Sequence, residues 1–402
     1  MRKSSDSGLA TCCCSTDPRL CSALRPPWSN LPVDIVMEIA ERLLPNAADL
    51  VRFASVCRSW WLLVKEETSL ARQLPWLMLA EEEIDAPSSG SNICRRFYSH
   101  SKNEIYELPV PKSQERFCCG SYASWIATVG MDLRMQLVNI FTGGSVELPS
   151  LYTFGASLHQ SGDWSPDSRR SLFVSKVCMS SSPSAGRDCH VVAFYGVGRM
   201  LGYARVGDDR WTTVNCDWWH YLDASFYKGQ FYLVNRKRDV VVLDVSQQQV
   251  HLIATKPKQR MVNYRWQIYL VESSGDLLYV VRVVKYSRKP TYDTKSFTVY
   301  KLNVSDGELQ KMSSLGGRSL FLGLNSSISV EASKLVGCQK DSIYFTDDLG
   351  DFKTYCTPGG GHDMGIYSMV DGSITPHYGG VSLSRVSPPL WVPIHPLFSP
   401  NI

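Results

Sequence analysis

The feature that most constrains the fold of this chain is a long series of short strand-like runs that begins after Phe117. β-branched and aromatic residues, interrupted by Gly, Asp and Asn turns, continue for about 280 of the 402 residues, a pattern typical of antiparallel β-structure. The clearest runs are Trp125–Val129, Met135–Ile140, Ser171–Val177, His190–Tyr195, Leu201–Val206, Gln230–Asn235, Val240–Val245, Leu277–Tyr286, Phe297–Asn303 and Ser342–Thr346. A single β-sandwich rarely needs so many strands, so the series favours a propeller.

The spacing of the runs supports this interpretation. Hairpins begin near residues 121, 172, 225 and 270, and then near 320 and 343, so the early interval is roughly 50 residues, the size of a kelch-type blade. The repeats share little identity, which leaves the number of blades open. We predict an all-β, propeller-like domain with kelch-like blades over residues 117–400. The strand-like segment Leu390–Ile394 is a candidate for closing it.

The region before this series has a helical pattern. Leu31, Ile35, Ile39 and Leu43 recur every four residues, and further apolar stripes follow up to about residue 72. Three short helices bury little surface, and their apolar residues exceed what so small a bundle can cover. We therefore predict a small all-α unit at residues 28–72 that docks on a partner.

The remaining segments carry weaker signals. Residues 1–27 are predicted to be a disordered leader, and its cysteines at positions 12, 13, 14 and 21 could instead form a lipidated or redox-active patch. Glu81–Glu83 and Pro87–Ser91 are polar, so residues 73–116 are interpreted as a linker.

Composition narrows the function classes. The net charge of +4 is spread along the chain, which argues against a nucleic-acid partner. No run of 18 apolar residues and no secretory signal are seen, so we expect no membrane partner. The thirteen cysteines form no CxxC pair and suit no zinc site. We expect reduced thiols, no metal, no cofactor, and a cytoplasmic and/or nuclear protein.

Enzyme motifs are weak. Gly196–Gly202 reads GxGxxxG, which is not the dinucleotide-binding spacing, and Gly359–His362 resembles an oxyanion loop although no GxSxG motif exists. The eight histidines show no HExxH spacing. We therefore expect a non-catalytic protein without catalytic residues, with a propeller enzyme as the remaining alternative.

Two local features are candidates for binding. The cluster Trp218, Trp219, His220 and Tyr221 is either the core of a blade, which we favour, or a recognition surface for a protein target. The hairpin tip Arg236–Arg238 could attract an acidic segment, although a solvated turn is the more common arrangement.

Two stretches of the helical region resemble the F-box. They are the opening Leu31–Val36 (LPVDIV) and the closing Val56–Trp60 (VCRSW). In the F-box family this unit docks on a Skp-type adaptor, which links it to a cullin and a RING subunit. Together, the uncovered apolar stripe and the resemblance indicate a set of adaptor-binding residues: Leu31, Pro32, Ile35, Ile39, Leu43, Val56, Cys57 and Trp60.

The remainder is similar to plant F-box proteins that carry a KIB-type β-propeller. The similarity rests on Leu137–Gly143, Leu201–Asp208, Tyr269–Leu278, Ser319–Gly323 and Ser342–Asp348. The chain departs from the family at Ile140, where the family usually has Asn-Pro before the Phe-Thr-Gly turn. The resemblance implies a substrate-receptor subunit of an SCF-type ubiquitin ligase that recruits an unknown protein target. A propeller protein that sequesters its partner without degrading it is the alternative.

Overall fold

A computed structural model describes residues 28–393 of the chain, apart from 44–46, 55, 68–73, 81–93, 114, 155–172, 197, 215–219, 256–263, 287–291, 349–360, 381 and 385–387. The predicted leader, residues 1–27, lies outside the described residues, and so do its four cysteines.

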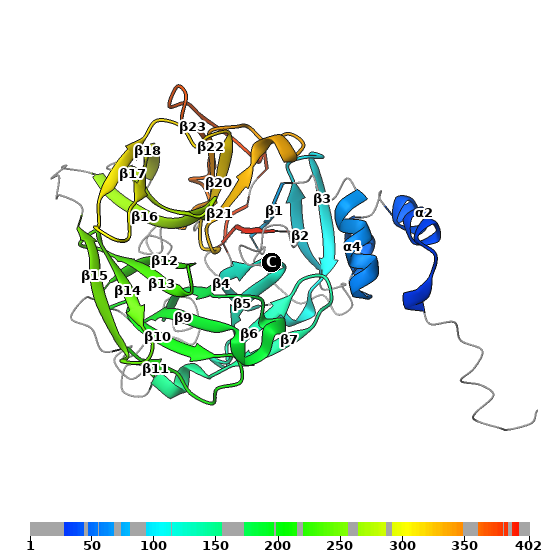
Figure 1. Ribbon diagram of the computed structural model, residues 1–402, viewed down its shortest axis with the longest axis horizontal. Helices are drawn as coiled ribbons and strands as arrows, with labels where there is room; N and C mark the ends of the chain where they lie inside the picture. Colours follow the sequence, from blue (N-terminus) through cyan, green and yellow to red (C-terminus); the bar gives the residue numbers. More distant parts are fainter. Residues whose placement is uncertain are drawn as a thin grey trace, which may run out of the picture.

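Short helices open the described part of the chain, and β-sheets arranged around one axis follow (Figure 1). After the 3₁₀ turn η1 (Trp28–Asn30) come α2 (Val33–Leu43), α3 (Ala47–Ala54) and α4 (Arg58–Glu67). Pro32 precedes α2, where its missing N–H costs nothing. Asp34 in the first turn and Arg42 in the last turn interact favourably with the helix dipole. The predicted order of a small helical unit and then an all-β propeller is confirmed.

Six sheets, each one blade, surround the axis of the described propeller. The strands of each blade are given from the innermost outward. Blade two contains β4 (Phe117–Tyr122), β5 (Trp125–Val129), β6 (Met135–Asn139) and β7 (Ser145–Leu148). Blade three contains β8 (Val174–Met179), β9 (His190–Tyr195), β10 (Met200–Arg205) and β11 (Thr212–Thr213). Blade four contains β12 (Tyr221–Tyr227), β13 (Gln230–Asn235), β14 (Asp239–Asp244) and β15 (Gln249–Thr255), and blade five contains β16 (Tyr264–Ser273), β17 (Asp276–Tyr286), β18 (Tyr292–Leu302) and β19 (Leu309–Met312).

Blade six departs from this simple meander. Its strands, from the axis outward, are β21 (Ile328–Glu331), β20 (Arg318–Leu322), β22 (Ser342–Phe345), β23 (Gly365–Ser368) and β24 (Ile374–Thr375). β21 follows β20 in the sequence but lies on its inner side, next to the axis. The chain then crosses back to the outer side of β20, where β22 pairs with β20 in parallel. The hairpin starts expected near residues 320 and 343 therefore belong to one blade.

Blade one contains β1 (Trp76–Met78), β2 (Cys94–Ser99) and β3 (Glu104–Pro109), with β25 (Leu390–Val392) as its innermost strand. The predicted linker at 73–116 is therefore wrong, since it supplies three strands of a blade. The polar residues after β1 led to the prediction of a linker, but all three residues of β1 are buried. Closure by Leu390–Val392 is confirmed, because Leu77 pairs with Trp391, but the partner strand lies before residue 117.

The innermost strands lie close together around the axis. All six residues of β4 are buried. A Cβ atom on Gly120 would lie 2.2 Å from the carbonyl oxygen of Val177 on β8, so only glycine allows this approach. In the Phe-Thr-Gly turn, the side chain of Asn139 accepts hydrogen bonds from the N–H groups of Phe141 and Thr142, which closes the turn although Ile140 stands where the resemblance led us to expect proline.

The core is divided into apolar layers between neighbouring blades. One layer joins blade five to blade six through Val280, Leu320 and Ile343, and another joins blade six to blade one through Phe321 and Trp391. The helices also take part in a layer. Ala40, Leu50 and Val64 belong to the same apolar cluster as Trp76 and Phe97 of blade one, and α4 runs beside β3 in Figure 1. Among the described residues, no helix is long and apolar enough to cross a membrane.

Candidate functional site

The helical unit presents apolar side chains to solvent. Ile35 is 40% exposed and Val56 is 58% exposed, and Pro32 is also exposed. Leu31, Ile39, Leu43 and Cys57 are half-buried. These residues, which lie just before α2, in α2 and in the turn before α4, form what we call the docking face. Seven of the eight predicted adaptor-binding residues keep some exposed surface there.

Trp60 is the exception among the predicted adaptor residues. It is only 5% exposed, and its ring stacks on Phe53 with 4.3 Å between the ring centroids. Burying this large ring holds α3 and α4 together, so Trp60 is a core residue of the helical unit. Sequence reasoning missed Trp28 and Val33, which are 67% and 57% exposed. Their position beside Leu31 and Pro32 was the available signal.

The aromatic cluster proposed for target binding is divided by the structure. Tyr221 is fully buried in the layer between blades three and four and stacks on Phe194, so its prediction as a contact residue is wrong. His220 is half-buried with a φ of 64°; its N–H donates to Gly198 (2.7 Å), and its carbonyl accepts from the N–H of Arg236 (2.8 Å). Trp218 and Trp219 lie outside the described residues.

The glycine-rich segment that ends at His362 is anchored rather than free at its described end. The N–H of Gly361 donates to Asp347 Oδ2 (2.7 Å), and His362 Nδ1 lies 3.4 Å from the same oxygen. Gly359 and Gly360 lie outside the described residues.

A buried ionic cluster lies next to this anchor. The fully buried guanidinium of Arg282 contacts Asp348 Oδ1 (3.1 Å) and Asp363 Oδ2 (2.9 Å), and its Nε donates to Thr294 Oγ1 (2.7 Å). Burial alone would lower the pKa of Arg282, but Tyr269 and the two carboxylates hold that pKa above its ordinary value. The cluster joins β17 and β18 to the segment that follows β22, so it fastens blade five to blade six.

The axis itself is crossed by the segment Gly323–Ser327, between β20 and β21. Lys176 on β8 forms a buried ion pair with Asp223 on β12 (2.7 Å) and donates to the carbonyl of Gly323 (2.8 Å). The N–H of Ser326 donates to Ser121 on β4 (2.9 Å). The hydroxyl of Ser327 donates to Asp223 on β12 (3.3 Å), so this segment of blade six contacts blades two, three and four directly.

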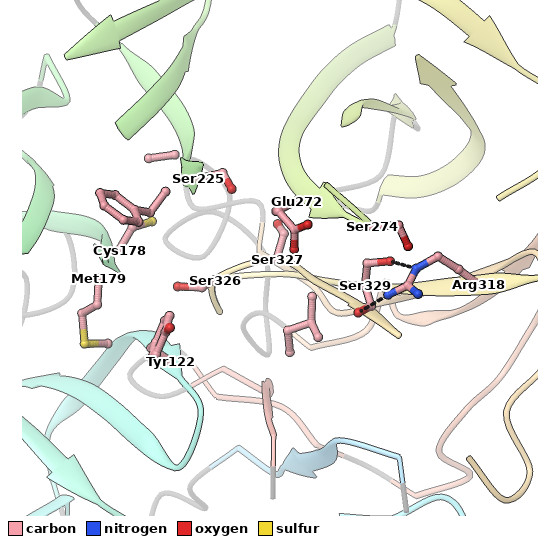
Figure 2. Close-up of a pocket in the computed structure, with 13 residues that line it drawn as sticks. Tyr122, Cys178, Met179, Ser225, Glu272, Ser274, Arg318, Ser326, Ser327 and Ser329 are labelled. Carbon is pink, nitrogen blue, oxygen red and sulfur yellow. Dashed lines mark hydrogen bonds between the residues drawn. The ribbon is translucent and has the colours of Figure 1, made fainter. Parts of the chain in front are cut away.

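A cavity of about 290 Å³ lies against this segment at one mouth of the axis, as Figure 2 shows. We call it the mouth pocket. Its polar lining comprises Ser225, Glu272, Ser274, Arg318, Ser326, Ser327 and Ser329. Its apolar lining comprises Tyr122, Cys178, Met179, Ala224, Phe226 and Ile328. Sequence reasoning did not find the pocket, because its lining comes from five blades and no motif joins these residues.

Comparison with known proteins agrees with this architecture. The profile of the family described as F-box-like matches residues 28–74, and that of the KIB1-4 beta-propeller matches residues 97–368. The "Probable F-box protein At4g22060" of Arabidopsis thaliana is 26% identical over 350 residues, which cover 79% of this chain and 83% of that protein. "F-box protein KIB2" of the same plant is 26% identical over 344 residues, which cover 79% and 72%.

Solved structures are more distant. The structure of TolB from Acinetobacter baumannii covers 85% of this chain and 72% of TolB, with 11% identity and a TM-score of 0.41, which is too low to carry an argument.

A short F-box followed by a six-bladed β-propeller defines the class of F-box proteins with the architecture of a substrate receptor. Within that class, because the family profile matches more than half of its length, the chain belongs to the KIB1-4 β-propeller family.

Proposed function

We propose that this protein is the substrate-receptor subunit of an SCF-type ubiquitin ligase. In this role the helical unit binds a Skp-type adaptor, and the adaptor connects it to a cullin and a RING subunit. The propeller recruits a protein target for ubiquitination. The chain would need no catalytic group, because holding target and ubiquitin carrier together raises their effective concentration. We propose the cytoplasm or nucleus as its location.

The observation that carries the proposal is the outward apolar surface of the F-box. Pro32, Ile35 and Val56 are exposed, although a small helical unit could have turned such residues inward. Exposed apolar residues gathered on one small unit mark a partner site. Burying one leucine or isoleucine fully is worth roughly 1.5–3 kcal/mol, so a few such residues suffice for specific binding.

The adaptor step is tested by the double substitution Leu31→Ala and Pro32→Ala. We expect capture of a purified Skp-type adaptor to fall at least about tenfold, which corresponds to about 1.4 kcal/mol. The matched control is Leu252→Ala, which removes a leucine that is 52% exposed on β15. Equal capture by the double variant and the control would contradict the proposal.

The outcome for the target is tested separately. Proteins bound to the full chain are compared with and without proteasome inhibition, and their ubiquitination is measured for the intact chain and for the double variant. A target whose ubiquitination depends on Leu31 and Pro32 supports the receptor role. A partner that binds but is not ubiquitinated would indicate sequestration instead.

A further inference from the structure

The turn between β13 and β14 carries three cations, Arg236, Lys237 and Arg238, and is held in place from two sides. The N–H of Arg236 donates to the carbonyl of His220, just before β12 (2.8 Å). The carbonyl of Arg238 accepts a hydrogen bond from the hydroxyl of Tyr279 on β17 of blade five (3.3 Å). The cations of this turn therefore occupy defined positions at the junction of blades four and five.

The side chain of Arg238 is oriented by an aromatic ring. It is half-buried, and its guanidinium carbon lies 4.5 Å from the centre of the Trp266 ring on β16. A guanidinium stacked on an indole keeps the N–H groups on its edge available, and their planar arrangement matches a carboxylate with two parallel hydrogen bonds. Among the described residues, neither Arg236 nor Arg238 forms an ion pair. Both arginines can therefore receive an anionic group from another molecule.

Blade five adds a lysine beside this ring. Lys285 pairs with Tyr264 in the β16–β17 register, so it lies on the same face of the sheet as Trp266. The neighbouring acidic residue, Asp293, lies opposite Lys285 in the β17–β18 register, and its Oδ2 is 3.8 Å from Lys295 Nζ. This one carboxylate is therefore outnumbered by two lysines.

The other acidic groups nearby are buried. Asp239, which follows the turn, is 6% exposed and accepts a hydrogen bond from the side chain of Asn235 (3.4 Å). The buried carboxylates around Arg282 belong to the other face of the blade five sheet, because it is the next residue, Val283, that shares an apolar layer with Trp266. Among the described residues of this junction, five cations therefore face two carboxylates: Arg236, Lys237, Arg238, Lys285 and Lys295 against Asp239 and Asp293. The first four of these cations form what we call the basic rim.

We propose that the basic rim binds an acidic segment of a protein partner. The edge of the Arg238 guanidinium takes one carboxylate, and Arg236 and Lys285 take carboxylates further along the segment. This inference rests on the proposed function, because the partner is the recruited target. A nucleic acid fits less well. The ring of Trp266, which could otherwise stack on a base, is already covered by Arg238, and the excess of positive charge is confined to the ends of two blades.

The test measures binding to the full chain by fluorescence anisotropy at low ionic strength, where charges are weakly screened. The probes are short peptides in which glycine alternates with glutamate, glutamine or lysine, and an oligothymidylate of the same length, all with the same dye. We expect saturable binding of the glutamate peptide, and none of the glutamine or lysine peptide. Absent binding of the glutamate peptide, or equal binding of the glutamine peptide, would overturn the proposal. Tighter binding of the oligothymidylate would assign the basic rim to nucleic acid instead.

The decisive variant combines Arg236→Gln with Arg238→Gln. Its affinity for the glutamate peptide should fall about fivefold or more, as expected when two charge-assisted contacts are lost. The matched control combines Lys102→Gln with Lys228→Gln, which removes the same charge from exposed turns elsewhere, Lys228 being at the opposite end of β13. Equal weakening in both variants would mean that the peptide responds only to net charge, and the basic rim would then be no site.

Two further measurements on the same samples separate the causes of a negative result. Thermal melting of both double variants should match that of the wild type, since the changed side chains are exposed or half-buried. Adaptor capture reports on the proposed function independently. A wild-type chain that captures the adaptor but ignores the glutamate peptide would disprove this inference alone.

Discussion

The helical unit exposes many of its large apolar residues, whereas the propeller buries nearly all of its own. Five of the twelve large apolar side chains that are exposed among the described residues lie between Trp28 and Leu62, although this segment is a small part of the chain. In the propeller, the layers between blades bury nearly all such residues. The difference indicates that the propeller is stabilised from within, whereas the helical unit keeps apolar surface for another molecule.

Removing the closing strand should destabilise the propeller more than any other change considered below. A chain that ends before Leu390 lacks β25, which leaves β1 unpaired and exposes the apolar residues that Trp391 covers. We expect insoluble protein without a cooperative thermal transition, measured by solubility and circular dichroism. A chain that ends after Pro393 keeps β25 and serves as the control. A soluble, cooperatively melting short form would show that blade one does not depend on this strand.

Breaking the buried ionic cluster should have the next largest effect. Arg282→Met leaves Asp348 and Asp363 buried without their cation. Loss of one member of such a group costs about 3–5 kcal/mol, which corresponds to roughly 5–8 °C in the melting temperature of a propeller of this size. The control Arg236→Met changes an exposed arginine on a turn and should shift melting by less than about 2 °C. Similar melting of the two variants would mean that the cluster does not fasten blades five and six.

Acid should weaken the propeller at its point of closure. His377 packs on Trp391 and is fully buried, which lowers its pKa to about 4, with His100 adding to this effect and a hydrogen bond to Phe345 opposing it. The folded-state pKa lies below the unfolded value of about 6.5, so the stabilisation is complete above that pH and is lost as the pH falls towards 4.

Between pH 7 and 4.5 this loss amounts to roughly 2–3 kcal/mol, and thermal melting at the two pH values measures it. His377→Gln, which can still donate to Phe345, should show a smaller loss than the wild type. The exposed His251→Gln is the control and should behave like the wild type. An identical pH dependence in all three proteins would contradict the role of His377.

A matched pair of valines tests the comparison directly. Val280 is fully buried between blades five and six, and Val280→Ala should cost about 2 kcal/mol of folding free energy. Val56→Ala should change stability by less than about 0.5 kcal/mol but weaken adaptor capture. Thermal melting and adaptor capture are measured on both variants. If Val56→Ala melts early and binds normally, Val56 stabilises the fold and does not belong to the docking face.

Much of the propeller could be predicted from local patterns. The predicted strands Trp125–Val129, His190–Tyr195 and Gln230–Asn235 coincide with β5, β9 and β13, because alternation and turn residues are local signals. Blade one could not be recognised in the same way. Its strands β1 and β2 are separated by a polar stretch, and its innermost strand comes from the other end of the sequence.

The binding surfaces were predictable only in part. The helical periodicity of apolar residues predicts the docking face, but it does not predict that the ring of Trp60 packs inward on Phe53. Tyr221 carries no local mark that separates a core aromatic residue from a surface one. The mouth pocket depends on the path of Gly323–Ser327 across the axis, which is a long-range arrangement that no spacing reveals.

The pairing of β1 with β25 also imposes a delay on folding during translation. About 310 residues separate the two strands, so at 5–20 residues per second β1 waits roughly 15–60 s for its partner. During this interval the helical unit has already left the ribosome, while the edge of blade one is still unprotected. The growing chain therefore exposes the docking face before its propeller is complete, and chaperones that shield unpaired edges would be needed most in this interval.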